Sequence, residues 1–182
     1  MTQIRLTPRP VTTAKHPLKT LFFVDHAVED SGMVLADLTP GTIVKRLPRA
    51  GDALDAIASL AEIQTVQIDR IVILSRGAPG TLRLSGRDID SAALRNADGS
   101  LGRIRATLTP KAEIVLMACA TGAGAAGHAF LRTLGIATGA TVKAAETNIG
   151  GSADRDPPAT TAVPVDESVL GATRSPAPMR LE

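Results

Sequence analysis

The residues best suited to chemistry lie in one stretch, Ile114 to Gly127, which reads IVLMACATGAGAAG. Cys119, the only cysteine of the chain, ends the apolar run of this stretch and precedes its small residues. A thiol at a strand end, just ahead of a helix N-terminus, is stabilised as a thiolate by the helix dipole. The unobstructed N–H groups of a glycine-rich turn could form an oxyanion hole. Cys119 is therefore a candidate nucleophile, although a lone free cysteine is more often a small buried hydrophobe.

The same stretch has the GxGxxG spelling of a dinucleotide-binding turn at Gly122, Gly124 and Gly127. Glu146 follows 19 residues after the last glycine, about where an acidic ribose ligand belongs. Two observations oppose this interpretation. The first glycine of such a turn follows its strand almost directly, whereas residues 119–121 intervene here. No further strand–helix–strand unit follows Glu146, so nucleotide binding is the least favoured function.

Composition and charge exclude several classes of function. Hydrophobic residues make up 44% of the 182-residue chain but aromatic residues only 2%, so the core must consist of Val, Ile, Leu and Ala. The net charge is +2, and no basic block is interleaved with aromatic residues, which argues against nucleic-acid binding. One cysteine excludes an internal disulfide, and no Cys/His cluster has zinc spacing. We expect no metal, no cofactor and no nucleic-acid partner.

The N-terminal sequence predicts no secretory signal, because its positive charges are not followed by an apolar segment. No apolar run is long enough to span a bilayer. These features fit a cytoplasmic protein or one exported by a signal-independent route. They leave the oligomeric state open.

Apolar periodicity predicts strands that alternate with helices. Strands are expected at Thr20–Asp25, Thr42–Leu47 (less buried), Arg70–Ser75, Glu113–Ala118 and Thr141–Glu146, with a hairpin at Gly80–Asp90 that turns at Ser85-Gly86. Helices are expected at Gly51–Ile63 with Asp52 as its cap, along a stripe of Leu101, Ile104 and Leu108 ended by Pro110, and at Gly122–Leu134 with Ala126, Phe130, Leu131 and Leu134 facing inward. This order predicts an α/β fold, a three-layer sandwich with a mainly parallel central sheet.

The chain divides into three parts by composition. Residues 1–19 form an extended N-terminal arm, and residues 20–150 form the α/β domain. Residues 151–182 form a Pro-, Ala- and Thr-rich tail, mostly irregular, with one edge strand near Thr160–Val165.

Several polar side chains follow predicted strands. Asp25 and His26 end the first strand, Arg76 and Gly77 follow the strand at 70–75, and Cys119 follows the strand at 113–118. Chemistry in parallel sheets gathers at the carboxyl ends of the strands. These residues are therefore the candidates for a shared site.

Three segments, LFFVD, IVILSRGAPGTLRLSGRDI and IVLMACATGAGAAGHAFLRTLGIATGATVKAAETNIG, resemble a bacterial domain family of unknown function. Its members typically lie near the N-termini of very large repeat-containing, calcium-binding or adhesin-like proteins. That family is similar to the caspase-type cysteine peptidases, which include gingipain and separase. The resemblance covers roughly residues 20–150 and implies a caspase-like fold, in which one central strand ends in Ser-His-Gly and the next in Gly-Cys.

The resemblance also implies roles for individual positions. Cys119 matches the family's cysteine, the presumed nucleophile, and Gly77 matches the glycine after the family's histidine. Arg76 occupies the histidine position itself. Arginine could hold a thiolate by charge, but it cannot act as a general acid or base. The dyad that the resemblance implies is therefore broken.

Other residues could compensate. His26 could face the same rim as the thiol and act as an alternative base, or it could be a solvated loop histidine. Asp25 could pair with Arg76, line a substrate pocket for a basic side chain, or cap the strand end. His128 is expected to point outward or pack against a neighbour, and His16 is expected to be exposed in the arm.

Three functions follow from these observations. The first is a degenerate caspase-like domain, a non-peptidolytic binding or structural module whose partner is a protein or peptide. The second is an active cysteine peptidase or self-processing domain that uses Cys119 with His26 as a rearranged base. The third is a nucleotide-binding α/β protein that uses Gly122 to Gly127.

Overall fold

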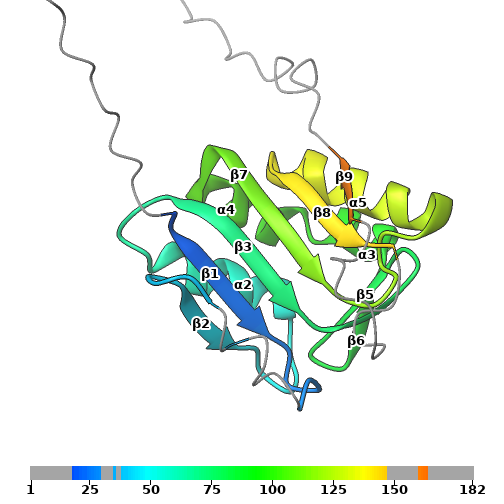
Figure 1. Ribbon diagram of the computed structural model, residues 1–182, viewed down its shortest axis with the longest axis horizontal. Coiled ribbons are helices and arrows are strands. Elements are labelled where there is room, and N and C mark those ends of the chain that lie inside the picture. The colour runs from blue at the N-terminus through cyan, green and yellow to red at the C-terminus, as the bar shows by residue number, and fades with distance from the viewer. Residues whose placement is uncertain (1–17, 30–34, 36–37, 147–159, 164–182) are drawn as a thin grey trace, which may run out of the picture.

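A computed structural model describes residues 18–29, 35, 38–146 and 160–163, and its centre is a six-stranded sheet (Figure 1). The strand order is β2-β1-β3-β7-β8-β9. All neighbouring strands are parallel except β9, which runs antiparallel to β8. The strands are β1 (Thr20–Val24), β2 (Ile43–Arg46), β3 (Ile68–Leu74), β7 (Leu108–Met117), β8 (Thr141–Ala145) and β9 (Thr160–Val163).

The burial of each strand follows its sequence pattern. β1 is buried at every residue, and β3 and β7 lie at the centre of the sheet, as their apolar runs predict. β2 alternates between half-buried and exposed residues, which confirms the expected lower burial, and it lies at the edge of the sheet. β9 confirms the edge strand expected in the tail.

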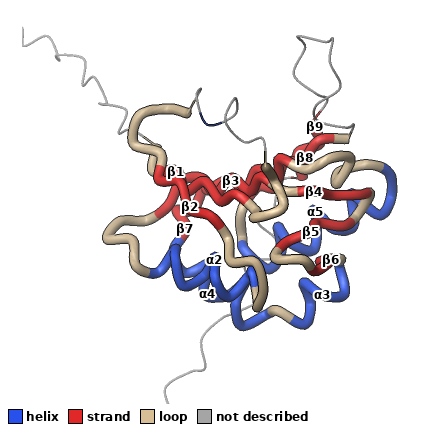
Figure 2. The backbone as a smooth tube through the Cα atoms, turned by 90° about the horizontal axis from the view of Figure 1, so that it is seen from below, coloured by secondary structure: helices blue, strands red, loops and turns tan. Residues whose placement is uncertain are grey.

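Helices cover one face of the sheet, as Figure 2 shows. They are α2 (Ala53–Glu62), α3 (Ser91–Asn96), α4 (Asp98–Thr107) and α5 (Gly124–Thr138). On the opposite face, the helical residue Leu35 packs with Val28 and Leu38 against Phe22, Val24, Val72 and Leu74. The predicted α/β sandwich with a mainly parallel sheet is confirmed. No helix of the described residues is long and apolar enough to cross a membrane.

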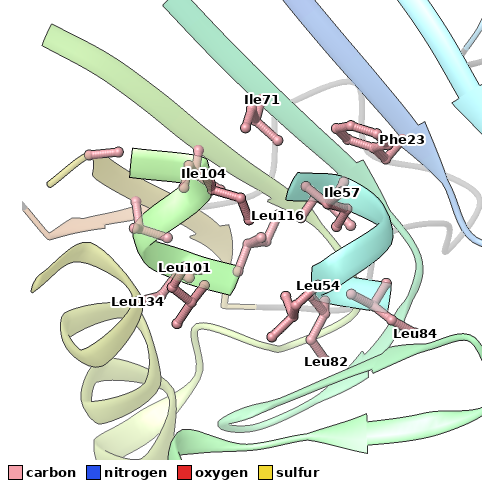
Figure 3. Packing of buried hydrophobic residues seen from close by; sticks show 14 of the residues in the cluster. Phe23, Leu54, Ile57, Ile71, Leu82, Leu84, Leu101, Ile104, Leu116 and Leu134 are labelled. Atoms are coloured by element: carbon pink, nitrogen blue, oxygen red, sulfur yellow. The ribbon is translucent and has the colours of Figure 1, made fainter. Parts of the chain in front are cut away.

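The main core lies between the sheet and the helices (Figure 3). Leu54 and Ile57 of α2, Ile104 of α4 and Leu134 of α5 pack against Ile71 and its neighbours in the sheet. Aliphatic residues dominate this core, in agreement with the composition. Burial of such side chains contributes roughly 1.5–3 kcal/mol each.

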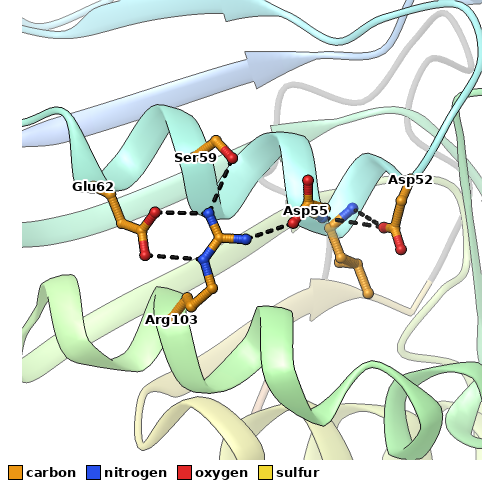
Figure 4. Close-up of polar contacts among 6 residues, drawn as sticks. Asp52, Asp55, Ser59, Glu62 and Arg103 are labelled. Carbon is orange, nitrogen blue, oxygen red and sulfur yellow. Dashed lines mark hydrogen bonds and ion pairs between the residues drawn. The ribbon is translucent and has the colours of Figure 1, made fainter.

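Polar contacts stabilise helix α2 at its N-terminal cap and against its neighbour α4. The Asp52 carboxylate accepts hydrogen bonds from the backbone N–H groups of Leu54 and Asp55, which confirms it as the cap. Arg103 of α4 donates to Glu62, Ser59 and Asp55 of α2 (Figure 4). The hydrogen bond to Glu62 raises the pKa of Arg103 above its usual range. These groups are exposed, so salt screens the pairing.

The sheet face opposite the helices carries an ion-pair row that crosses three neighbouring strands. Glu113 of β7 accepts hydrogen bonds from Lys143 of β8 and Arg70 of β3. The hydrogen bond from Lys143, followed by that from Arg70, lowers the pKa of the Glu113 carboxyl. The row ties together three neighbouring strands.

Two expectations about α4 and β7 were wrong. Leu108 does not belong to the helical stripe, because α4 ends at Thr107 and Leu108 is extended. Pro110 does not terminate that helix and lies within β7 instead. The β3–β7 register jumps from Ile68↔Leu108 to Arg70↔Glu113, so Pro110 sits in an irregular stretch that needs no ladder hydrogen bond from it.

Candidate functional site at the carboxyl edge of the sheet

A small antiparallel sheet lies against the carboxyl ends of the main strands (Figure 1). It consists of β4 (Arg76–Ala78), β5 (Thr81–Leu84) and β6 (Arg87–Ile89). The turn between β5 and β6 has positive φ at Ser85 and Gly86, which confirms the predicted hairpin. Two hydrogen bonds anchor this sheet. The Gly80 N–H donates to the Thr121 carbonyl at 3.1 Å, and the Ser85 N–H donates to the Asp25 carboxylate. The small sheet therefore spans the edge from β1 to β7.

Cys119 lies two residues after β7 in a tight turn and is half-buried. The next residue, Ala120, has a φ of 50°, which is unusual for a residue with a side chain. The turn closes with a hydrogen bond from the Ala123 N–H to the Ala120 carbonyl. Helix α5 begins directly afterwards, at Gly124 rather than at the predicted Gly122. The thiol therefore sits where the sequence predicts, between a central strand and a helix start.

Gly77 packs directly against the turn that carries Cys119. A Cβ atom at Gly77 would lie 2.1 Å from Thr121 Oγ1, 3.0 Å from Ala118 Cβ and 3.1 Å from the Cys119 carbonyl oxygen. Only glycine fits this close approach. The position thus brings the segment after β3 against the segment after β7.

Arg76 projects from the other face of β4. Gly77 is paired with the buried Leu82, whereas Arg76 is paired with the exposed Arg83. Because successive side chains of a strand alternate between faces, Arg76 is directed away from the Cys119 turn that Gly77 contacts. Arg76 lines an open groove of about 410 Å³ on the outer face of the small sheet.

Asp25 is fully buried, and each oxygen of its carboxylate accepts a hydrogen bond from a backbone N–H group. Oδ1 accepts from the Ala27 N–H at 3.0 Å, and Oδ2 accepts from the Ser85 N–H at 2.7 Å. This placement fits the strand-end cap that the sequence left as one alternative. It anchors the β5–β6 turn, 60 residues away in the chain, to the end of β1.

His26 lies beside Asp25, with 3.6 Å between its Nδ1 and Asp25 Oδ1. Its Nδ1 is buried without a hydrogen-bond partner among the described residues. His26 follows β1, and β3 separates β1 from β7, which precedes Cys119. Two strand spacings amount to about 10 Å between the backbones. His26 and Cys119 therefore share the edge of the sheet but belong to strands that are not neighbours.

The glycines of the GxGxxG stretch serve close packing. A Cβ atom at Gly127 would lie 2.2 Å from the Gly122 carbonyl carbon, so this glycine lets α5 press onto the preceding turn. The Gly122 N–H donates to the Ala145 carbonyl at the end of β8. Gly127 is buried and Ala126 is exposed, so the expected inward position of Ala126 was wrong by one residue.

This packing gives the glycines a structural role. Gly122 lies against the carboxyl end of β8. Glu146, the expected ribose ligand, lies 3.9 Å from His128 Nε2, and both side chains are exposed. His16 lies outside the described residues.

Residues 21–156 match the model of a family described as Domain of unknown function (DUF4347). The chain belongs to this family. No curated protein matches the chain, and no solved structure does. The matched segment of this DUF4347 chain contains Asp25, His26, Arg76, Gly77 and Cys119.

Two features of the DUF4347 site were missed from the sequence. β4 has only three residues and follows β3 almost directly, so no periodic signal distinguishes it. Thr121 is fully buried, and its Oγ1 donates to the Thr81 carbonyl at 3.2 Å, which ties the Cys119 turn to β5. Within the described residues, no group of three or more His, Cys, Asp or Glu side chains could hold a metal ion.

Proposed function

We propose that this chain is a caspase-like domain without peptidase activity that acts as a polypeptide-binding module of a bacterial protein. The resemblance to caspase-type peptidases supports the fold assignment, because the order of segments matches and the glycine after the histidine position contacts the cysteine turn. The loss of activity is supported by Arg76, which replaces the histidine that would deliver a proton to the leaving amine.

The direction of Arg76 is the observation that carries this proposal. A working dyad needs its base within hydrogen-bond reach of the thiol. Arg76 lacks the necessary chemistry, and it also lies on the face of β4 opposite to the one that contacts the Cys119 turn. Both the residue type and its orientation therefore oppose proton transfer at this position.

A second candidate function is an active cysteine peptidase with His26 as the base. The positive φ of Ala120 favours it, because strained backbone next to a nucleophile is often part of an active site. The half-buried position of Cys119 is compatible with it as well. Against it stand the intervening strand β3 and the position of His26 beside Asp25.

Alkylation of Cys119 by iodoacetamide separates the two functions. An activated thiolate reacts faster than an ordinary thiol. We expect folded wild-type protein to react no faster than the same chain unfolded in urea. Both rates are measured by intact-mass spectrometry at the same pH, and the rate in urea is corrected for the effect of urea on the reagent.

His26→Ala and His128→Ala provide a matched pair of variants for this measurement. His128 is an exposed histidine on α5, so its replacement controls for a general loss of imidazole. We expect both variants to alkylate at the wild-type rate. A folded-state rate at least about tenfold above the unfolded rate, which falls in His26→Ala but not in His128→Ala, would contradict the proposal, because it shows a thiolate that His26 activates.

A further inference from the structure

The outer face of the small sheet carries a row of three charged side chains. Arg76 of β4 is directly opposite Arg83 of β5, and Arg83 is directly opposite Asp88 of β6. Residues in register across antiparallel strands point to the same face. Arg76, Arg83 and Asp88 therefore project together into solvent, and all three are exposed.

The charges of this row are unbalanced. Arg83 donates two hydrogen bonds to Asp88, from Nε at 2.7 Å and from Nη2 at 3.0 Å. The hydrogen bonds from Arg83 lower the pKa of Asp88, so this pair is ionised and self-compensated at neutral pH. No carboxylate of the described residues forms an ion pair with Arg76. One positive charge of the row thus remains uncompensated, and like charges opposite each other are unfavourable without an anion.

The three charged side chains line a groove in the surface. Arg76, Arg83 and Asp88 line the groove of about 410 Å³, together with Gly77, Ala78 and Thr81. Gly77, Ala78 and Thr81 have short side chains, so a ligand can approach the backbone closely. β4 is also the edge strand of the small sheet, and edge strands can pair with an extended peptide through main-chain hydrogen bonds.

We propose that this groove binds an acidic peptide segment, with an aspartate or glutamate carboxylate of the partner between Arg76 and Arg83. The guanidinium fork of arginine matches a carboxylate in two parallel hydrogen bonds. Asp88 competes with the ligand for Arg83. The edge of β4 receives the main chain of the peptide, which favours a polypeptide over a free small anion. This assignment rests on the proposed function only in taking the partner to be a polypeptide.

The test is an NMR titration of the ¹⁵N-labelled chain with the peptide Gly-Glu-Glu-Gly-Ser, blocked at both termini. We expect saturable shifts of the Gly77, Ala78 and Thr81 amides, and no saturation with the Gln-Gln analogue. Arg76→Met should weaken binding at least about tenfold, because it removes a charge-assisted contact. Asp88→Asn should strengthen binding, because it releases Arg83.

Arg87→Met is the matched control. Arg87 of β6 is another exposed arginine that does not line the groove of Arg76, so its loss changes the net charge without removing a residue of the site. The proposal is overturned if the Glu-Glu peptide does not saturate these amides, if the Gln-Gln analogue binds equally well, or if Arg87→Met weakens binding as much as Arg76→Met. Inorganic phosphate that competes as well as the peptide at equal concentration would also overturn it, in favour of a general anion site.

The spectra of the variants show whether each is folded, so lost binding cannot be confused with unfolding. The titration is also independent of peptidase chemistry. Peptide binding together with Cys119-dependent cleavage would refute the proposed loss of activity while leaving the acidic-peptide groove intact.

Discussion

Gly127→Ala is expected to lower the free energy of unfolding by about 2 kcal/mol. The new Cβ atom would lie 2.2 Å from the Gly122 carbonyl carbon, 2.4 Å from the Gly122 oxygen and 2.8 Å from the Thr121 oxygen. These are backbone atoms of a turn, so they cannot rotate away as a side chain would. Overpacking typically costs about 1–3 kcal/mol, and we expect the upper end here, reduced by the higher helix propensity of alanine.

Gly102→Ala is the control for helix propensity. Gly102 lies in α4 with nothing within 4 Å of its Cβ position, so alanine should stabilise the protein by about 0.5–1 kcal/mol. Urea unfolding followed by circular dichroism measures both variants. Equal effects of the two substitutions would show that α5 does not press on the Cys119 turn as described.

Asp25→Ala is expected to have the second large effect, a loss of about 2–3 kcal/mol. The substitution removes the acceptor of the Ser85 and Ala27 N–H groups, and leaving a buried donor unsatisfied costs about 1–3 kcal/mol. Asp25 is fully buried, so water cannot easily replace the carboxylate. Because the lost bond anchors the hairpin, amide hydrogen exchange of β5 and β6 should accelerate more than that of β3.

Asp52→Ala offers the comparison for Asp25→Ala. Asp52 also accepts two backbone hydrogen bonds, but it is an exposed helix cap, for which about 1 kcal/mol is typical. Urea unfolding of both variants gives the difference. If Asp25→Ala costs no more than Asp52→Ala, the buried carboxylate does not anchor the small sheet.

The main sheet was predictable because its signals are local. The apolar runs of β1, β3 and β7 specify buried strands, and the Ser85-Gly86 pair specifies a tight turn. The cap at Asp52 likewise depends only on residues within the next turn of helix. Such features need no knowledge of the tertiary structure.

The site was less predictable because its contacts are long-range. The hydrogen bond between Ser85 and Asp25 joins residues 60 positions apart, and neither segment contains a sequence signal that predicts the contact. The direction of the Arg76 side chain depends on β4. This strand has only three residues and is paired with β5. The sequence therefore identified which side chains reach the carboxyl edge but not which way they point.

The GxGxxG stretch illustrates the same difference. Its spelling predicts a phosphate-binding turn, whereas Gly122 and Gly127 are needed where α5 meets the preceding turn and the end of β8. Close packing and phosphate binding both require glycine, so the residue type alone cannot distinguish them.

Peptide cleavage itself decides whether this chain is, as proposed, a caspase-like domain without peptidase activity. The most direct measurement compares wild-type protein with Cys119→Ala on a proteome-derived peptide library, with new termini identified by mass spectrometry. We predict the same background products for both proteins, since Arg76 cannot transfer a proton and β3 separates the strands that precede His26 and Cys119. Products that wild-type protein forms and Cys119→Ala does not would refute the proposed loss of activity and establish a cysteine peptidase.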